Sequence, residues 1–145
     1  MVTLDTQESV LTAVYTLLAA DSTLKTAMGG TVRLYPVWAP PDATFPYLVN
    51  RLDMIASDPF PARAGTYIVD IWSNSVAASE IVAIRKRLIE LLDEYMFNTT
   101  DVKNIKLMLQ TDGFIPETEP DIWHYTIQFN VRLWRQSEFL YINTR

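Results

Sequence analysis

The stretch Trp123–Arg135 constrains the fold of this chain more strongly than any other, because apolar and polar side chains alternate along it. The apolar set is Trp123, Tyr125, Ile127, Phe129, Val131 and Leu133; the polar set is His124, Thr126, Gln128, Asn130 and Arg132. Successive side chains of a strand point to opposite faces. The pattern therefore predicts a long strand with one buried face, at the centre of a sheet.

Two earlier segments also have strand character. Phe45–Met54 begins with Pro46, which favours the start of a strand or an edge position. Gly65–Ser73 is apolar on both faces, with Tyr67, Val69 and Ile71 on one, and Ile68 and Trp72 on the other, interrupted by Asp70. A sheet too apolar for one covering layer usually has a second partner.

The remaining strand signals are shorter. Val32–Tyr35 predicts a short strand, and Pro36–Thr44 an ordered, Pro-rich loop. Ile55–Ala64 predicts a long mobile hairpin loop at a functional surface, with Phe60 and Arg63 exposed. Asn104–Gln110 alternates like a strand, and Asp112-Gly113 favours a bulge in a longer strand over a hairpin turn.

Three segments have helical spacing. In the first, Asp5 is the predicted N-cap, followed by Val10, Val14, Leu17 and Leu18. The second, Ser22–Met28, is capped by Asp21 and ended by Gly29-Gly30. The third is capped by Ser75, carries a stripe of Ile81, Ile84, Leu88, Leu91 and Tyr95, and is broken at Asn98–Asp101. The order predicts an α+β fold: a mainly antiparallel sheet of two hairpins with helices packed on one face.

Composition narrows the class of protein. A length of 145 residues with 49% hydrophobic content predicts one domain with a sizeable core. The net charge of −5 argues against broad binding to a phosphate backbone. There is no Cys, which excludes disulfides, thiolate metal sites and a Cys nucleophile. Val10–Ala20 lacks a preceding Lys or Arg and predicts a helix in place of a signal peptide, and we expect no membrane span.

We expect no catalytic, cofactor-binding or metal site, and hence no enzyme. His124 is the single histidine, and it lies on the polar face of its strand with no nucleophile elbow in the sequence. Glu117, Glu119 and Asp121 join His124 in a loose cluster, which an acidic turn between Pro116 and Pro120 explains without a metal.

The aromatic residues suggest interfaces instead. Trp38, Phe60, Trp72 and Trp134 are interface candidates, since aromatic side chains are enriched there. Trp38 and Trp72 would equally well complete the core. Trp134 interrupts the polar face of its own strand, and therefore points more clearly to an interface.

With these residues in place, the chain resembles the tail-completion, or tail-terminator, proteins of long-tailed bacteriophages and prophages. The matching motifs run from Leu18-Ala19-Ala20-Asp21-Ser22-Thr23-Leu24 through Leu34-Tyr35-Pro36, Pro40-Pro41, Phe45-Pro46-Tyr47-Leu48-Val49, Tyr67–Ser73, Glu80 with Ile84-Arg85, to Phe129-Asn130-Val131-Arg132. They are structural motifs without an active site.

The resemblance implies a single tail-terminator-like domain over residues 1–145, with residues 136–145 as a C-terminal extension. It implies a homo-oligomer, typically a hexameric ring, that caps the tail tube, ends its polymerisation and joins tail to head. The implied partners are the tail tube protein and the neck or connector proteins, while DNA passes through without specific binding. The implied location is the head-proximal end of the tail in the virion, after synthesis in the host bacterial cytoplasm.

Two other functions remain open at this point. One is a head–tail connector or neck protein, and the other is a monomeric ligand- or protein-binding module that uses the Pro36–Thr44 loop. The C-terminal segment Ser137–Arg145 is too apolar for a solvated tail, with Phe139 and Tyr141 as interface candidates. It either docks on a neighbouring subunit or partner, or folds back as an edge strand.

Overall fold

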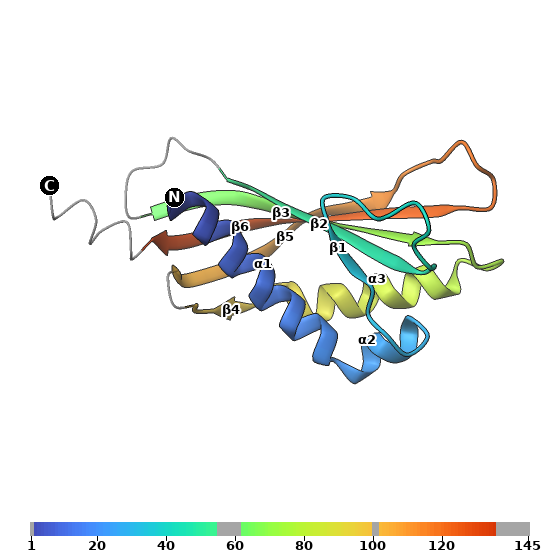
Figure 1. The fold of residues 1–145 in the computed structure, drawn as a ribbon, viewed down its shortest axis with the longest axis horizontal. Coiled ribbons are helices and arrows are strands. Elements are labelled where there is room, and N and C mark those ends of the chain that lie inside the picture. Colours follow the sequence, from blue (N-terminus) through green and yellow to red (C-terminus); the bar gives the residue numbers. More distant parts are fainter. Residues whose placement is uncertain (1, 55–61, 100–101, 136–145) are drawn as a thin grey trace, which may run out of the picture.

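A six-stranded sheet with three helices on one of its faces forms the body of the protein (Figure 1). The structure, a computed structural model, describes residues 2–54, 62–99 and 102–135. The elements are α1 (Val2–Ala20), α2 (Ser22–Ala27), β1 (Leu34–Pro36), β2 (Tyr47–Met54), β3 (Ala62–Ser73), α3 (Ser79–Leu92), β4 (Met96–Phe97), β5 (Val102–Phe114) and β6 (Trp123–Arg135). The predicted α+β class is confirmed.

The sheet is mixed, with the strand order β1-β2-β3-β6-β5-β4. The two predicted hairpins, β2–β3 and β5–β6, are present, and β3 pairs antiparallel with β6 to join them. A sheet of two hairpins alone is too simple a description, however. The short β1 adds to one edge in parallel with β2, and the two-residue β4 adds to the other edge.

The predicted alternation of β6 is confirmed. Tyr125, Ile127, Phe129, Val131 and Leu133 are all buried in one core cluster, with Trp123 partly buried against it. The polar set between them is more exposed. Burial of such a row contributes roughly 1.5–3 kcal/mol per large apolar side chain, as an upper estimate.

The helices supply the other half of this core. Val10, Val14 and Leu18 of α1 are fully buried, whereas Leu17 is only partly buried. In α3 the buried stripe is Ile81, Ile84, Leu88 and Leu92. Leu91 also lies in α3 and is partly buried against the core, but the predicted continuation of the helical stripe to Tyr95 is wrong, because the helix ends at Leu92 and Glu94 takes a positive φ of 62°. Figure 1 shows all three helices on the same side of the sheet.

The helix caps divide into one confirmed prediction and two errors. Asp21 caps α2 as predicted, since its Oδ2 accepts from the Leu24 N–H at 2.8 Å. Asp5 is not an N-cap, because α1 already begins at Val2. Ser75 does not cap α3, which begins at Ser79 after Ala78. Its backbone is engaged elsewhere, because its N–H donates to Ser73 Oγ and its carbonyl accepts from the Trp123 indole.

Two hairpin strands, β3 and β5, are longer than the sequence indicated, whereas β6 has the predicted bounds and β2 begins at Tyr47, later than the predicted Phe45. β3 begins at Ala62, so the expected loop Ile55–Ala64 is shorter at its C-terminal end, and residues 55–61 lie outside the described residues. The strand continues through Asp112 and Gly113 as predicted, but the bulge predicted at these two residues is wrong, because they pair regularly with Ile127 and Thr126. The register shifts lie elsewhere, between Lys103 and Lys106 and between Leu109 and Thr111.

Helix length and hydropathy decide whether a helix could span a membrane. In the described part of the chain, no helix is long and apolar enough to cross a membrane.

The structure predicts a large difference between two glycine substitutions. A Cβ on Gly65, in β3, would press on the Asp53 carbonyl oxygen and lie 2.7 Å from Met54 Sδ, whereas a Cβ on Gly113 would meet nothing within 4 Å. Because backbone cannot move aside cheaply, we expect Gly65→Ala to lower the free energy of unfolding by about 1–3 kcal/mol. Gly113→Ala is the matched control and should change it by less than about 0.5 kcal/mol. Equal effects in chemical denaturation would contradict the close packing of β2 on β3.

Candidate functional site: the open face of the sheet

The side of the sheet opposite the helices, here called the open face, carries the side chains that alternate with the core. In β3 these include Ile68, Asp70 and Trp72, and in β6 they include His124 and Trp134. The predicted two-faced character of β3 is confirmed, because Tyr67, Val69 and Ile71 are buried under the helices while the next residues face away. No described helix covers this side (Figure 1).

A row of rings crosses one end of the open face. Tyr47, Trp72 and His124 are directly opposite one another on β2, β3 and β6. Trp72 stacks on His124 with ring centroids 3.8 Å apart, and on Tyr47 at 6.3 Å. Tyr35 of β1 continues the row by an edge contact with Tyr47 at 6.0 Å. Cross-strand ring pairs of this kind stabilise a sheet and stiffen its surface.

His124 is held between two carboxylates. Its Nε2 lies 3.1 Å from Asp70 Oδ1, and its Nδ1 lies 2.9 Å from Glu117 Oε2. Burial alone would lower the pKa of His124, but the hydrogen bonds to Asp70 and Glu117, together with their charges, outweigh it and raise the pKa above 6.5. The two contacts of His124 link β6 to β3 and to the connection between β5 and β6.

This geometry favours a structural role for His124 over catalysis. Both ring nitrogens are occupied by acceptors, so neither is available as a general base in this state. Glu117 is the member of the predicted acidic cluster that contacts His124. Across residues 2–54, 62–99 and 102–135, no three His, Asp or Glu side chains are placed to hold a metal ion.

The predicted interface residues have different environments. Trp72 is partly buried within the ring row, and Trp134 is 46% exposed at the opposite end of the open face, facing Ala62 and Lys103. The expectation that Arg63 is exposed is wrong, because only 6% of it is accessible. It pairs with Leu133 inside β3, since β6 is long enough to extend the ladder down to Ala62.

Three other interface candidates, Phe60, Phe139 and Tyr141, lie outside the described residues. Trp38, for which core and interface were both open, is 80% exposed and is not part of the core. Sequence reasoning missed the contact between Asp70 and His124, and the register of β3 against β6 is the signal that reveals it.

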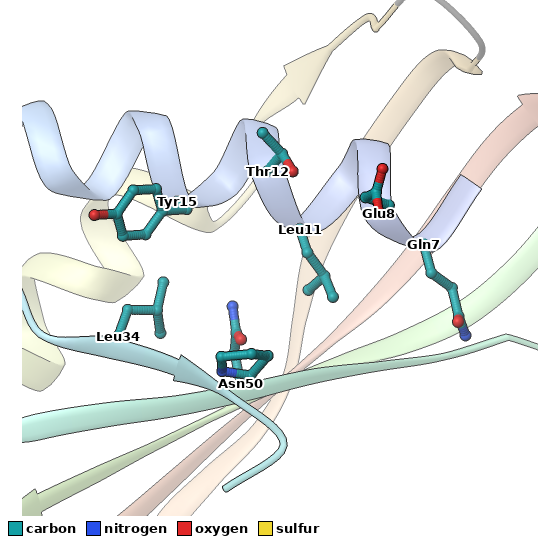
Figure 2. A pocket seen from close by; sticks show the side chains of 8 residues that line it. Gln7, Glu8, Leu11, Thr12, Tyr15, Leu34 and Asn50 are labelled. Carbon is teal, nitrogen blue, oxygen red and sulfur yellow. The ribbon is translucent and has the colours of Figure 1, made fainter. Parts of the chain in front are cut away.

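A separate cavity of about 580 Å³ lies on the helix side, between α1 and the strands β1 and β2 (Figure 2). In Figure 2 the Leu11 side chain points from α1 toward the sheet, the Tyr15 ring lies above Leu34, and Asn50 rises from β2. Asn50 is held by a 2.8 Å hydrogen bond from its Nδ2 to Tyr67 Oη, whose pKa burial raises. The binding-module hypothesis uses the Pro36–Thr44 loop, and Pro36 of that loop is among the residues that line this cavity.

Comparison with known proteins shows similarity of fold, without a match in sequence to a family model or a curated protein. Among solved structures, a chain of the virion of a native gene transfer agent particle superposes with a TM-score of 0.70, covering 83% of this chain and 91% of that chain at 17% identity. A second solved protein gives a TM-score of 0.62 at 14% identity, covering 89% of this chain and 96% of the other.

The arrangement around His124 predicts a pH-dependent contribution to stability. Because the folded-state pKa is raised above 6.5, the contribution is fully present below about pH 6.5 and is lost as pH rises through the folded-state pKa. We expect the charge-assisted contacts to contribute roughly 1–2 kcal/mol at low pH. The single histidine makes a direct NMR titration of its ring possible.

Asp70→Asn should lower the measured pKa of His124 and flatten the pH profile of stability. Glu119→Gln is the matched control, since it neutralises an exposed acid on the same connection that makes no described contact with the ring. A wild-type His124 that titrates below pH 6.5, or equal effects of the two variants, would contradict the bridged geometry.

Proposed function

We propose that this chain is a structural protein of a long-tailed phage or phage-like particle, which forms a ring on the finished tail tube. The ring ends polymerisation of the tube and joins the tail to the head. The observation that carries the proposal is the fold similarity to a virion chain of a gene transfer agent, which extends over most of both chains. The tail-terminator motifs in the sequence support the same assignment independently.

Those motifs occupy defined places in the fold. Leu34-Tyr35-Pro36 forms the edge strand β1, and Phe45–Val49 leads into β2. Tyr67–Ser73 is the part of β3 that separates the helix-covered core from the open face. The remaining motifs lie where α1 meets α2, in the loop between β1 and β2, in α3 and in β6, so the resembling residues occur in both the helices and the sheet.

The architecture suits a ring subunit. A cyclic assembly joins one surface of each copy to a different surface of the next. This chain has one face covered by helices, one open face and two short, unlike edge strands, so its sides are distinct. The net charge of −5 suits a channel through which DNA passes without binding.

The remaining parts of the proposal follow from this role. The chain acts as one domain, without enzymatic activity, cofactor or metal, and resides in the virion at the head-proximal end of the tail after synthesis in the bacterial cytoplasm. Its partners are further copies of itself, most simply six in a ring, the tube protein and the neck proteins. A head–tail connector would use the same kind of ring at a different position in the virion. The 580 Å³ cavity favours a monomeric binding module as a second candidate function.

A tube-elongation assay distinguishes these functions. The tail tube protein encoded with this chain would be polymerised in vitro with increasing amounts of the purified protein. We expect mean tube length to fall at substoichiometric amounts, with a ring at one tube end in electron micrographs, because one ring stops many subunits from adding.

Unchanged tube length with rings bound to head connectors would contradict the terminator role and favour the neck protein. Protein that stays monomeric and binds neither structure would contradict both virion roles and favour the binding module.

A further inference from the structure

Trp38 stands out from the body of the protein on the loop between β1 and β2. Its side chain is 80% exposed, and the preceding Val37 is 66% exposed. Tryptophan carries a large apolar area and is over-represented among residues that dominate binding energy at interfaces. So large and so exposed an apolar side chain on a surface loop needs an explanation beyond the fold of the monomer.

The backbone before Trp38 is strained. Val37 has a φ of 65°, and the Trp38 N–H donates to the Pro36 carbonyl at 2.7 Å. Together these form a γ-turn with a positive φ, which is rare, and a β-branched residue in that region is an outlier. Strain of this kind is retained where the surrounding structure enforces it and function uses it.

The surrounding structure does hold the loop rigidly. The Val37 N–H donates to the Asn50 carbonyl at 2.8 Å, which fixes the turn to β2. Arg33 binds the other end of the loop, because its Nε lies 3.0 Å from the carbonyl oxygens of both Thr44 and Pro46. Its Nη2 also donates to the Met28 carbonyl at 3.0 Å. A loop that is ordered before binding loses little entropy when it binds.

The same chain carries a receptor of matching chemistry. A cavity of about 230 Å³ lies at the connection between β5 and β6, residues 115–122. Its lining combines apolar side chains with carboxylates, including Phe114, Ile115, Trp123, Glu117 and Glu119. Phe114 is 50% exposed and Ile115 is 38% exposed, so apolar surface lies open to solvent there. An indole needs an apolar wall and an acceptor for its N–H, and this lining offers both.

Trp38 and the cavity lie at different positions along the order of strands in the sheet. Trp38 follows β1 at one edge, whereas the cavity follows β5, with β2, β3 and β6 between. At about 4.8 Å per strand, four strand spacings separate β1 from β5 by roughly 19 Å. This is the arrangement that a head-to-tail ring requires, because each copy must present two different, complementary patches.

We propose that Trp38 of one copy inserts into the cavity at the β5–β6 connection of the next copy around the ring. The inference rests on the proposed ring function and identifies the contact that holds neighbouring copies together. The strained Val37 turn and the Arg33 contacts preposition the indole, and the Glu117 and Glu119 carboxylates orient its N–H.

Cysteine cross-linking tests the contact directly, because the natural chain contains no Cys. The double variant Ala39→Cys/Ile115→Cys places one thiol beside Trp38 and the other at the cavity. Under mild oxidation of the assembled protein, we expect a ladder of covalent oligomers on a non-reducing gel. Each single variant should give no ladder, while a mixture of the two should give a heterodimer and nothing larger.

A second pair of variants tests the energetic role. Trp38→Ala should raise the concentration needed for assembly at least about tenfold and leave the unfolding temperature unchanged, because the indole is exposed in the monomer. Val82→Ala is the matched control, because Val82 is 45% exposed on α3 and is not among the residues that line the cavity, and it should leave assembly unchanged.

The outcomes separate this inference from the proposed function. Wild-type rings with no ladder from the double variant, or rings that form equally well with Trp38→Ala, would overturn the Trp38 contact and leave the ring function standing. A wild-type protein that stays monomeric, both free and with tail tubes, would overturn both.

Discussion

The antiparallel pairing of β6 with β3 and β5 is the interaction on which the rest of the structure depends. It places the two hairpins side by side and fixes the register of every residue across the centre of the sheet. A slip of one residue would send the buried row of β6, from Tyr125 to Leu133, to the opposite face. The same register brings Asp70 next to His124 and stacks Trp72 on its ring.

Because the apolar row commits one face to the helices, no described helix covers the other face. The open face is stiffened at one end by rings from β1, β2, β3 and β6. The edge at β1 supports the exposed Trp38, and the β5–β6 connection presents an open apolar cavity. A protein with two such unlike sides is well suited to a closed, head-to-tail assembly.

Local patterns in the sequence predicted the long elements, and failed where tertiary contacts decide. The alternation in β6 and the Asp21 cap were readable because each signal lies within a few neighbouring residues. A short strand was predicted at Val32–Tyr35, but pairing with β2 sets the actual bounds of β1. The two-residue β4 is too short for a periodic pattern and is defined by its pairing with β5. Ser75 has cap chemistry, but its backbone groups bond to Ser73 and Trp123, so the helix starts later.

The open face and the Trp38 loop were predictable from the sequence only in part, because tertiary contacts decide which of their residues meet and which are exposed. His124 and Asp70 are 54 positions apart, so no local pattern reveals their contact. An aromatic residue in a Pro-rich loop suits a core as well as a surface, and only the fold shows Trp38 exposed. Arg63 was wrongly predicted to be exposed in a loop, because the length of β6 determines that β3 begins at Ala62 and includes Arg63.

Native mass spectrometry of the purified chain tests the central claim, that copies close into a ring through two unlike sides, most directly. Over a wide range of concentrations the account predicts monomer and one larger species of fixed copy number, most simply six. Closure leaves no free patch at which a further copy can add. Monomer alone at every concentration, or an open series of masses that lengthens with concentration, would contradict it.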